Sequence, residues 1–354
     1  MSRRRFVSPV LVVAASVALL AGCAPAPVKS TAMPESAYCA RMVTNSGGLE
    51  DRSFNQSSWD GLKQARDKLK IDVAAIVSNS ETDLAPNVAE AVGTGCPFIL
   101  TVGYELADAT AAEAKANPDV HFSIVDEQVD GENIKPIVFD TAQASYLAGY
   151  LAAGVSKTGK VGTFGGGNQP PVTLFMDGFA DGIDKYNELH HTAVTLLGWD
   201  KATQNGTFTG DFEDTNKGKS YTQGMLDQGA DVILPVAGQV GEGAAAAILE
   251  SGTASLIWVD NDGYETLPAE YRPIVLTSVL KNTQDAVVKI VGDDMNGTFD
   301  NKPFVGTLKN GGVEIAPFHD RDSLVSKALA TEINQIRAAI IAGIITVESP
   351  SAPK

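Results

Sequence analysis

The sequence contains few histidines and lacks the short motifs of common hydrolases and phosphate-binding enzymes. Its histidines are His121, His190, His191 and His319. They show no metal-ligand spacing such as H-x-x-E-H, no G-x-S-x-G motif is present, and the Gly165-Gly166-Gly167 run lacks a following Gly-Lys-Ser/Thr. We therefore expect no catalytic residues, no metal and no cofactor. This pattern favours a binding protein over an enzyme.

Basic residues are scarce relative to acidic ones. The chain has 27 Lys and Arg against 43 Asp and Glu, a formal net charge of −16. An acidic surface repels nucleic acid and anionic lipid, so we expect no nucleic-acid partner. The same charge keeps a protein soluble.

Long hydrophobic runs are also scarce, and the main one lies at the amino terminus. Arg3–Arg5 precede an apolar run from Val10 to Ala21, which is too short to span a bilayer as a permanent helix. The run ends in Leu20-Ala21-Gly22-Cys23, the pattern of a bacterial lipoprotein signal. We expect residues 1–22 to be a signal peptide and Cys23 to carry the lipid. The alternative is an ordinary signal peptide in which the cysteine is accidental.

Residues 23–37 are rich in proline, alanine, serine and threonine, which is typical of a flexible tether. Two or more acyl chains give stable membrane anchoring, whereas one gives only marginal binding. The sequence therefore predicts a protein anchored through Cys23 to the extracytoplasmic face of the bacterial cell membrane. A second apolar stretch, Ala338–Ile345, is short and completes an amphipathic helix.

Three cysteines are present, and Cys23 is assigned to the anchor. The remaining pair, Cys39 and Cys96, would lie in an oxidising compartment, where an even pair is usually a disulfide. Each precedes or begins a predicted strand, and parallel neighbouring strands begin at the same edge of a sheet. A disulfide is expected; the alternative is a pair of buried thiols that pack as small hydrophobic groups.

From residue 38 onward, short β-rich runs alternate with longer helical patterns, which indicates parallel sheets flanked by helices. The pattern restarts near Thr141, so we predict an α/β protein with two lobes. The N-terminal lobe is expected to comprise residues 38–140 and 262–301, and the C-terminal lobe residues 141–261 and 302–346. Chain crossings near 140, 261 and 302 would form a three-segment hinge. Ligands of open α/β sheets bind beyond the carboxyl ends of the strands, so the cleft between the lobes is the expected site.

The loop after the first strand carries a specific motif. Residues 48–61 read Gly-Leu-Glu-Asp-Arg-Ser-Phe-Asn-Gln-Ser-Ser-Trp-Asp-Gly. This segment resembles the opening motif of the basic membrane protein family of ABC-importer receptors, roughly G-x-x-D-x-S-F-N-x-x-x-W/F-x-G. Further matches follow in order and include Phe122–Asp126, Tyr146–Gly149, Gly178–Gly182, Phe212–Asp214, Gly229–Ile233, Gly238–Gly243, Val259–Asp262 and Leu276–Lys281.

The resemblance implies a two-lobe type I periplasmic-binding-protein fold and a preference for nucleosides, especially purine nucleosides. It also implies an ABC-transporter permease as partner, and we expect a monomer. Candidate ligand-binding residues at the strand ends are Asp51, Asn55, Trp59, Asp126, Phe208, Phe212, Gly238, Asp260 and Lys281. Apolar residues at helical spacing predict a helix from Ser57 to Leu69. Trp59, at the start of this helix, is expected to cover one face of the base, and Phe212 the other, with Phe208 as a rival.

Polar candidates match the remaining parts of a nucleoside. The resemblance implies that Asp126 accepts a hydrogen bond from the base edge, as its counterpart does in the family. Asn55 offers both a donor and an acceptor, which also suits a base edge. Asp51 is expected in the same wall. Asp260 and Lys281 suit the ribose hydroxyls, and Gly238 allows close approach of the backbone to the sugar.

Several alternatives remain open at this point. Trp59 and either phenylalanine could pack in the core, Asp126 could be a cap or turn residue, and Asp260 and Lys281 could form a structural salt bridge. Arg52 stands where many members of the family have an acidic residue, and it could alter base choice. A receptor of the same fold for a sugar or other polar metabolite, or a sensory binding protein, is the alternative function.

Overall fold

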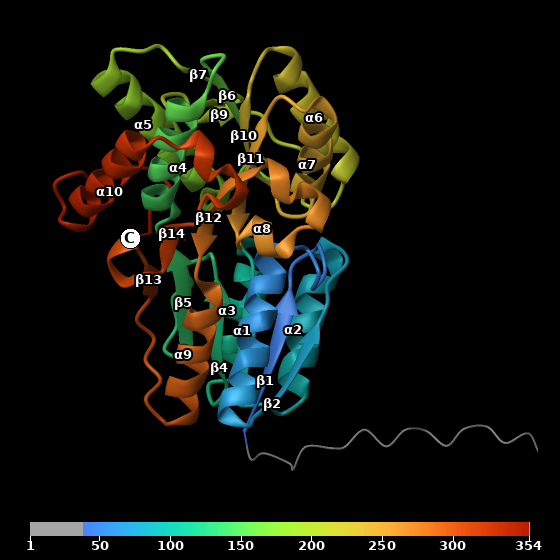
Figure 1. Ribbon diagram of the computed structural model, residues 1–354. Coiled ribbons are helices and arrows are strands. Elements are labelled where there is room, and N and C mark those ends of the chain that lie inside the picture. Colours follow the sequence, from blue (N-terminus) through green and yellow to red (C-terminus); the bar gives the residue numbers. More distant parts are fainter. Residues whose placement is uncertain (1–37, 354) are drawn as a thin grey trace, which may run out of the picture. The chain divides into compact units, whose positions relative to one another are not determined.

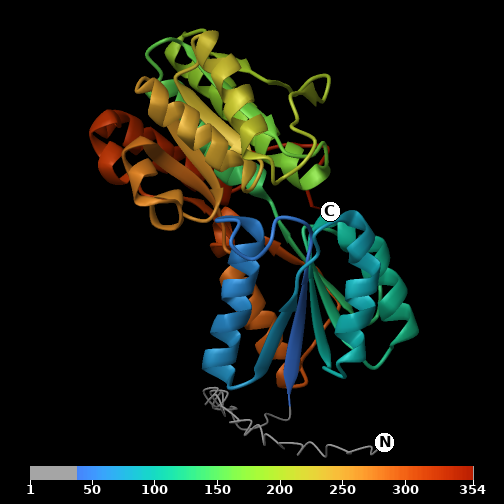
Figure 2. The same cartoon turned by 90° about the vertical axis from the view of Figure 1, so that its right-hand side faces the viewer.

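The computed structural model describes residues 38–353 and contains two six-stranded sheets (Figure 1). The first sheet is parallel throughout and has the order β13-β5-β4-β3-β1-β2. Its strands are β1 (Cys39–Thr44), β2 (Asp72–Ile76), β3 (Phe98–Val102), β4 (His121–Val125), β5 (Ile134–Phe139) and β13 (Phe304–Gly306). Helices α1 (Phe54–Leu69) and α9 (Thr283–Met295) cover one face, and α2 (Leu84–Gly93) and α3 (Ala107–Ala116) cover the other (Figure 2).

The second sheet has the order β14-β12-β11-β10-β6-β7, with β14 antiparallel to its neighbour. Its strands are β6 (Lys160–Gly165), β7 (Thr195–Leu197), β10 (Val232–Val236), β11 (Ser255–Asp260), β12 (Val275–Lys281) and β14 (Val313–Ile315). The paired helices that flank it are α4 (Thr141–Val155) with α5 (Pro170–His190), and α6 (Thr215–Asp227) with α7 (Val240–Ser251). Helix α10 (Lys327–Ile341) packs on α4.

Short elements complete the chain. They are the hairpin β8 (Trp199–Asp200) and β9 (Asn205–Gly206), the helix α8 (Gly263–Thr266), and the 3₁₀ helices η1 (Glu81–Asp83), η2 (Tyr104–Leu106), η3 (Ala269–Ile274), η4 (Leu308–Asn310) and η5 (His319–Leu324). The alternation of strands and helices, and the two sheets it produces, confirm the fold class expected from the sequence.

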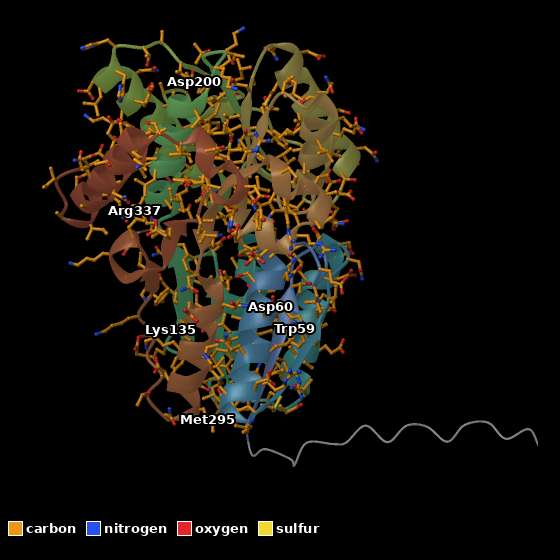
Figure 3. All side chains as sticks on the ribbon, viewed as in Figure 1. Trp59, Asp60, Lys135, Asp200, Met295 and Arg337 are labelled. Atoms are coloured by element: carbon orange, nitrogen blue, oxygen red, sulfur yellow. A yellow bond between two sulfur atoms is a disulfide. The ribbon has the colours of Figure 1, made fainter. Side chains whose placement is uncertain are left out.

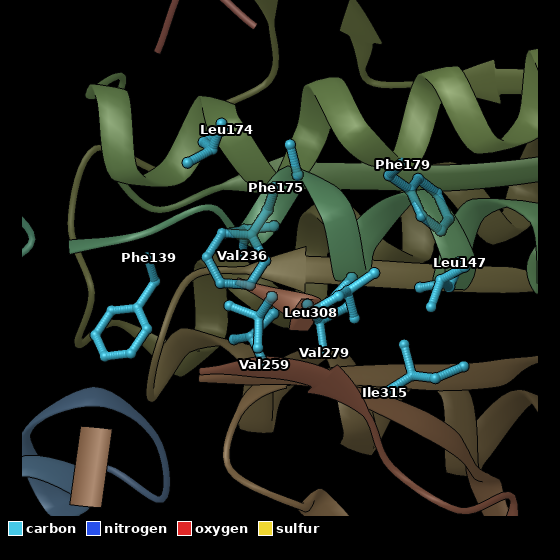
Figure 4. Packing of buried hydrophobic residues seen from close by; sticks show 14 of the residues in the cluster. Phe139, Leu147, Leu174, Phe175, Phe179, Val236, Val259, Val279, Leu308 and Ile315 are labelled. Carbon is cyan, nitrogen blue, oxygen red and sulfur yellow. The ribbon is translucent and has the colours of Figure 1, made fainter. Parts of the chain in front are cut away.

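Helices α4 and α5 pack closely enough to require glycine at their contact. A Cβ on Gly149 would lie 2.0 Å from the carbonyl oxygen of Phe179, and a Cβ on Gly182 would lie 2.0 Å from that of Tyr146. Two of the sequence segments that suggested a family resemblance, Tyr146–Gly149 and Gly178–Gly182, therefore serve packing and not ligand contact. Figure 4 shows Leu147 of α4 and Phe179 of α5 in this core, with Phe175 nearer the strand ends.

The division of strands between the sheets differs from the expected boundaries in two places. Residues 275–281 were expected in the N-terminal lobe, but β12 belongs to the second sheet; residues 304–306 were expected in the C-terminal lobe, but β13 belongs to the first sheet. The chain therefore passes between the sheets near residue 140, between β12 and α9, and between β13 and β14. Hydrophobic pattern identifies a buried strand, but not the sheet in which it pairs, because strands of both sheets carry buried apolar residues.

Cys39 and Cys96 form a disulfide at the amino-terminal edge of β1 and β3, which are parallel neighbours as expected. In residues 38–353, no helix is both long enough and apolar enough to cross a membrane. The expected signal peptide, Cys23 and the whole of the expected tether lie outside the residues that the structure describes.

Candidate ligand-binding site

A cavity of ≈ 600 Å³, counting the space open to solvent, lies at the carboxyl ends of strands from both sheets. Loops after β1, β3 and β4 supply one wall, and the start of α5 with the ends of β10, β11 and β12 supplies the other. This is the location that the strand-end rule predicts. Seven of the expected residues line it, namely Asp51, Asn55, Asp126, Phe212, Gly238, Asp260 and Lys281.

Asp51 organises the start of α1 from within the cavity wall. Its carboxylate accepts hydrogen bonds from the backbone N–H groups of Ser53 (3.0 Å), Asn55 (2.8 Å) and Gln56 (2.9 Å). Burial raises the pKa of Asp51 to about 6; the Asp260 charge adds to the rise, and the three N–H donors oppose it. Asp51 therefore fixes the loop that carries Phe54 and Asn55.

Asn55 lines the cavity with only its acceptor unpaired, whereas the sequence suggested a donor and an acceptor together. Its Nδ2 donates to Asn45 Oδ1 (2.9 Å) and to the carbonyl of Ser46 (3.2 Å). Asn55 Oδ1 is buried without a protein partner, in a side chain that is 1% exposed. Asn45 Nδ2 in turn donates to Glu105 Oε2 (3.3 Å), so this wall offers mainly acceptors.

Lys281 joins carboxylates from both lobes. Its Nζ lies 2.5 Å from Asp126 Oδ2, at the end of β4, and 3.4 Å from Asp260 Oδ1, at the end of β11. Burial alone would lower the pKa of Lys281, but the two carboxylates outweigh it and raise the pKa, so the ammonium stays charged. Asp126, which the sequence showed without a cationic neighbour, is therefore paired.

Both carboxylates are held by unusual backbone conformations. Asp126 has φ 68° and Asp260 has φ 66°, in the left-handed region that non-glycine residues seldom occupy. Such strain concentrates at functional sites, where the surrounding structure maintains it. The side chains of Asp126 and Asp260 are 8% and 9% exposed, so the charges face the cavity with little contact with bulk water.

Four aromatic residues line the cavity: Phe54 at the start of α1, Tyr104 in η2, Phe175 in α5, and Phe212 before α6. Phe212 lies against Gly166, where a Cβ would stand 2.3 Å from its ring, so this position requires glycine. Phe54 and Phe212 come from opposite lobes. They provide two apolar faces on the two sides of the cleft.

Two expected aromatic residues lie elsewhere. Trp59 is not among the residues that line the cavity; Figure 3 places it on the body of α1, where Lys63 Nζ lies 6.0 Å from its ring. The sequence suggested a helix from Ser57, which would place Trp59 at its start, but α1 begins at Phe54. Phe208 packs against Gly165 and makes an edge contact with Trp199, so Phe212 is the residue that reaches the cavity.

Arg52 also lies outside the cavity lining. Its carbonyl oxygen accepts hydrogen bonds from three groups of the second lobe: Trp258 Nε1 (3.3 Å), Asn261 Nδ2 (3.4 Å) and Thr266 Oγ1 (3.2 Å). Its guanidinium donates to the carbonyl of Thr266 (3.4 Å). Arg52 therefore connects the lobes and gives no structural support to a role in base choice.

Sequence reasoning missed Phe54, Phe175, Asn45 and Glu105 as lining residues. Phe54 could have been found, because it lies in the Ser-Phe-Asn motif beside Asn55. Phe175 looks like an ordinary apolar residue in a helix, and no sequence signal distinguishes it. Within residues 38–353, no group of three or more His, Cys, Asp or Glu side chains is arranged to hold a metal ion.

Comparison with known proteins gives a consistent set of matches. Residues 40–351 match a family model described as ABC transporter substrate-binding protein PnrA-like. The chain is 31% identical over 366 residues to the "ABC transporter nucleoside-binding protein BmpA" of Lactococcus lactis subsp. cremoris, covering 98% of this chain and 99% of the relative. It is 28% identical to "Basic membrane protein A" of Borreliella burgdorferi, covering 86% of each.

The fold also matches solved structures. An ABC transporter solute-binding protein from Aeropyrum pernix K1 superposes with a TM-score of 0.79, at 23% identity, covering 88% of this chain and 94% of that one. At this identity the match concerns the fold alone.

Proposed function

Because the chain belongs to the Bmp family of PnrA-like ABC transporter substrate-binding proteins, we propose that it captures a nucleoside, preferentially a purine nucleoside, in the cavity between its lobes. Membership confirms the expectation of a binding protein, not an enzyme. The observation that carries the ligand assignment is the pair Phe54 and Phe212, which line one cavity from opposite lobes together with a buried Lys281–carboxylate cluster.

The base occupies the space between Phe54 and Phe212. Stacking of a base on an aromatic ring contributes about 1–3 kcal/mol in single-strand binders. Two such contacts account for about half of the roughly 8 kcal/mol of a micromolar complex. The acceptor Asn55 Oδ1, buried without a protein partner, calls for an N–H donor on the base edge, which purines such as guanine and hypoxanthine present. Asp126 contributes a second acceptor on the same wall.

The ribose occupies the side of the cavity where Asp260 and Lys281 meet. Its hydroxyls both donate and accept, so a carboxylate and an ammonium together satisfy them. Gly238, with φ 54°, allows the backbone to approach the sugar edge. Because the ligand touches both lobes, binding shifts the population toward the closed form, and the closed form docks on the permease.

We assign the protein to the extracytoplasmic face of the cell membrane, held as a monomer by lipid on Cys23. The lipoprotein pattern Leu20-Ala21-Gly22-Cys23 supports this assignment. Replacement of Cys23 by serine should release the protein from membranes in fractionation experiments. Retention of the Cys23→Ser protein in the membrane fraction would contradict the anchor.

Calorimetric titration of ligand-stripped protein tests the ligand class. Guanosine, inosine, adenosine and cytidine should be compared with free nucleobases, ribose and galactose. We expect micromolar or tighter binding of purine nucleosides, with weaker binding of isolated bases and sugars. Binding of ribose or galactose with no response to any nucleoside would support the sugar-receptor alternative and overturn the proposal.

A further inference from the structure

We propose that residues 347–353, here called the strap, position the ligand-facing end of α5 and the loop that carries Phe212. Ser349 and Asp177 are the central positioning residues. The consequence for ligand release rests on the proposed nucleoside-binding function, whereas the structural consequence does not.

The first two turns of α5 lie between the ligand cavity and the strap. Val172 and Phe175 line the ligand cavity, whereas Thr173 and Asp177, one turn apart, bond to the strap. Ser351 Oγ lies 2.8 Å from Thr173 Oγ1, and Ser349 Oγ donates to Asp177 Oδ2 at 2.6 Å. The strap therefore supports this helix end from the side opposite the ligand.

Asp177 is a buried carboxylate, 0% exposed, that accepts hydrogen bonds from three donors in two segments, the strap and the β8–β9 hairpin. Besides Ser349, it accepts from Trp199 Nε1 (2.9 Å) and from Gln204 Nε2 (2.9 Å). A buried charge is costly unless hydrogen bonds satisfy it, so the loss of any donor loosens the cluster. Ser349 is the donor that the strap supplies.

The same cluster leads to the aromatic wall of the ligand site. Trp199 makes an edge contact with Phe208, at a centroid distance of 6.0 Å, and Phe208 packs on Gly165. Phe212, four residues further along the loop, lies on Gly166 and faces the cavity. The hydrogen bonds of Asp177 thus link α5, which carries Phe175, to the segment that positions the loop of Phe212.

The strap is itself firmly attached. Lys201 Nζ donates to the carbonyl oxygen of Glu348 (2.5 Å), Val347 is buried, and Ala352 packs against the main core. Pro350 and Pro353 border a second opening of ≈ 850 Å³, solvent included, whose other wall includes Asp126 and Phe139. Since Asp126 lines both cavities, the strap borders an opening that adjoins the ligand site.

Hydrogen exchange and ligand release test the proposal together. A chain that ends at Glu348, and the variant Ser349→Ala in the full chain, should be compared with wild type and with the control Ser251→Ala, which removes a hydroxyl bond at the end of α7. In ligand-free protein, amides of residues 173–178 should exchange at least about tenfold faster in both strap variants. Guanosine release, followed by stopped flow, should be at least about tenfold faster, corresponding to the loss of one hydrogen bond to a buried charge.

The control Ser251→Ala should leave exchange in residues 173–178 and guanosine release unchanged. Ser349→Thr keeps the hydroxyl, so its exchange and release rates should equal those of wild type. Unchanged exchange or unchanged release in Ser349→Ala and in the chain ending at Glu348 overturns the proposal. If wild-type protein binds none of the nucleosides, the proposed function fails, and the exchange measurement alone decides whether the strap positions α5.

Discussion

At the scale of single residues, the account depends on which aromatic side chains reach the cavity. Phe54 and Phe212 do so, whereas Trp59 and Phe208 lie in other packing environments. Phe54 and Phe212 should therefore contribute to ligand binding directly, whereas Trp59 and Phe208 should contribute to packing.

Replacing Phe54 or Phe212 by leucine removes a π face while keeping an apolar side chain. We expect each change to weaken guanosine binding about 5- to 150-fold, the range that corresponds to about 1–3 kcal/mol of stacking. Trp59→Phe is the matched control and should change the dissociation constant less than about threefold. Titration calorimetry measures all three variants; a large loss confined to Trp59→Phe would show that the aromatic assignment is wrong.

Asp51 makes stability depend on pH through its raised pKa. The pKa is about 6 in the folded protein against an ordinary value of 3.8, so the folded state binds the proton more tightly. This group contributes full stability below pH 3.8, and the contribution is lost as the pH rises through 6. Between pH 7 and pH 4.5, the free energy of unfolding of wild type should rise by about 2 kcal/mol relative to Asp51→Asn. Urea denaturation of both proteins at the two pH values checks this, and a pH-independent difference would contradict it.

At the scale of elements, the sequence predicts the alternation of strands and helices and the strand ends that carry the site. Two features could not be predicted. The sheets to which β12 and β13 belong depend on long-range contacts, because apolar strands occur in both sheets. The helix was expected from Ser57, but α1 begins at Phe54, because the Asp51 carboxylate accepts hydrogen bonds from the backbone N–H groups of its first turn. Local helix propensity does not reveal such a capping arrangement. Because of this three-residue difference, Trp59 was the expected stacking residue, whereas the structure places Phe54 at the start of α1.

The disulfide between the starts of β1 and β3 lies at the sheet edge opposite the ligand cavity. Closing a loop of this length stabilises a fold by about 2–4 kcal/mol, largely through the unfolded chain. The double variant Cys39→Ala, Cys96→Ala should therefore lose about that free energy of unfolding and keep its affinity for guanosine. Denaturant titration and calorimetry measure the two quantities. A large loss of affinity in the folded variant would show that the two ends of the sheet are coupled.

At the scale of the whole molecule, the negative charge of the cavity should disfavour anionic ligands. The cavity contains four carboxylates, from Asp51, Glu105, Asp126 and Asp260, against one lysine, Lys281. A phosphate dianion placed there meets net repulsion in a poorly hydrated space. We expect guanosine 5′-monophosphate to bind at least about 100-fold more weakly than guanosine. Equal affinities in calorimetry would place the ligand outside this group of charges.

The crystal structure of a guanosine complex tests the central claim most directly. We predict that the purine ring lies between Phe54 and Phe212, that a base N–H donates to Asn55 Oδ1, and that ribose hydroxyls contact Asp260 and Lys281. Guanosine bound with its base away from both phenylalanine rings, or bound outside the cavity between the lobes, would contradict the account.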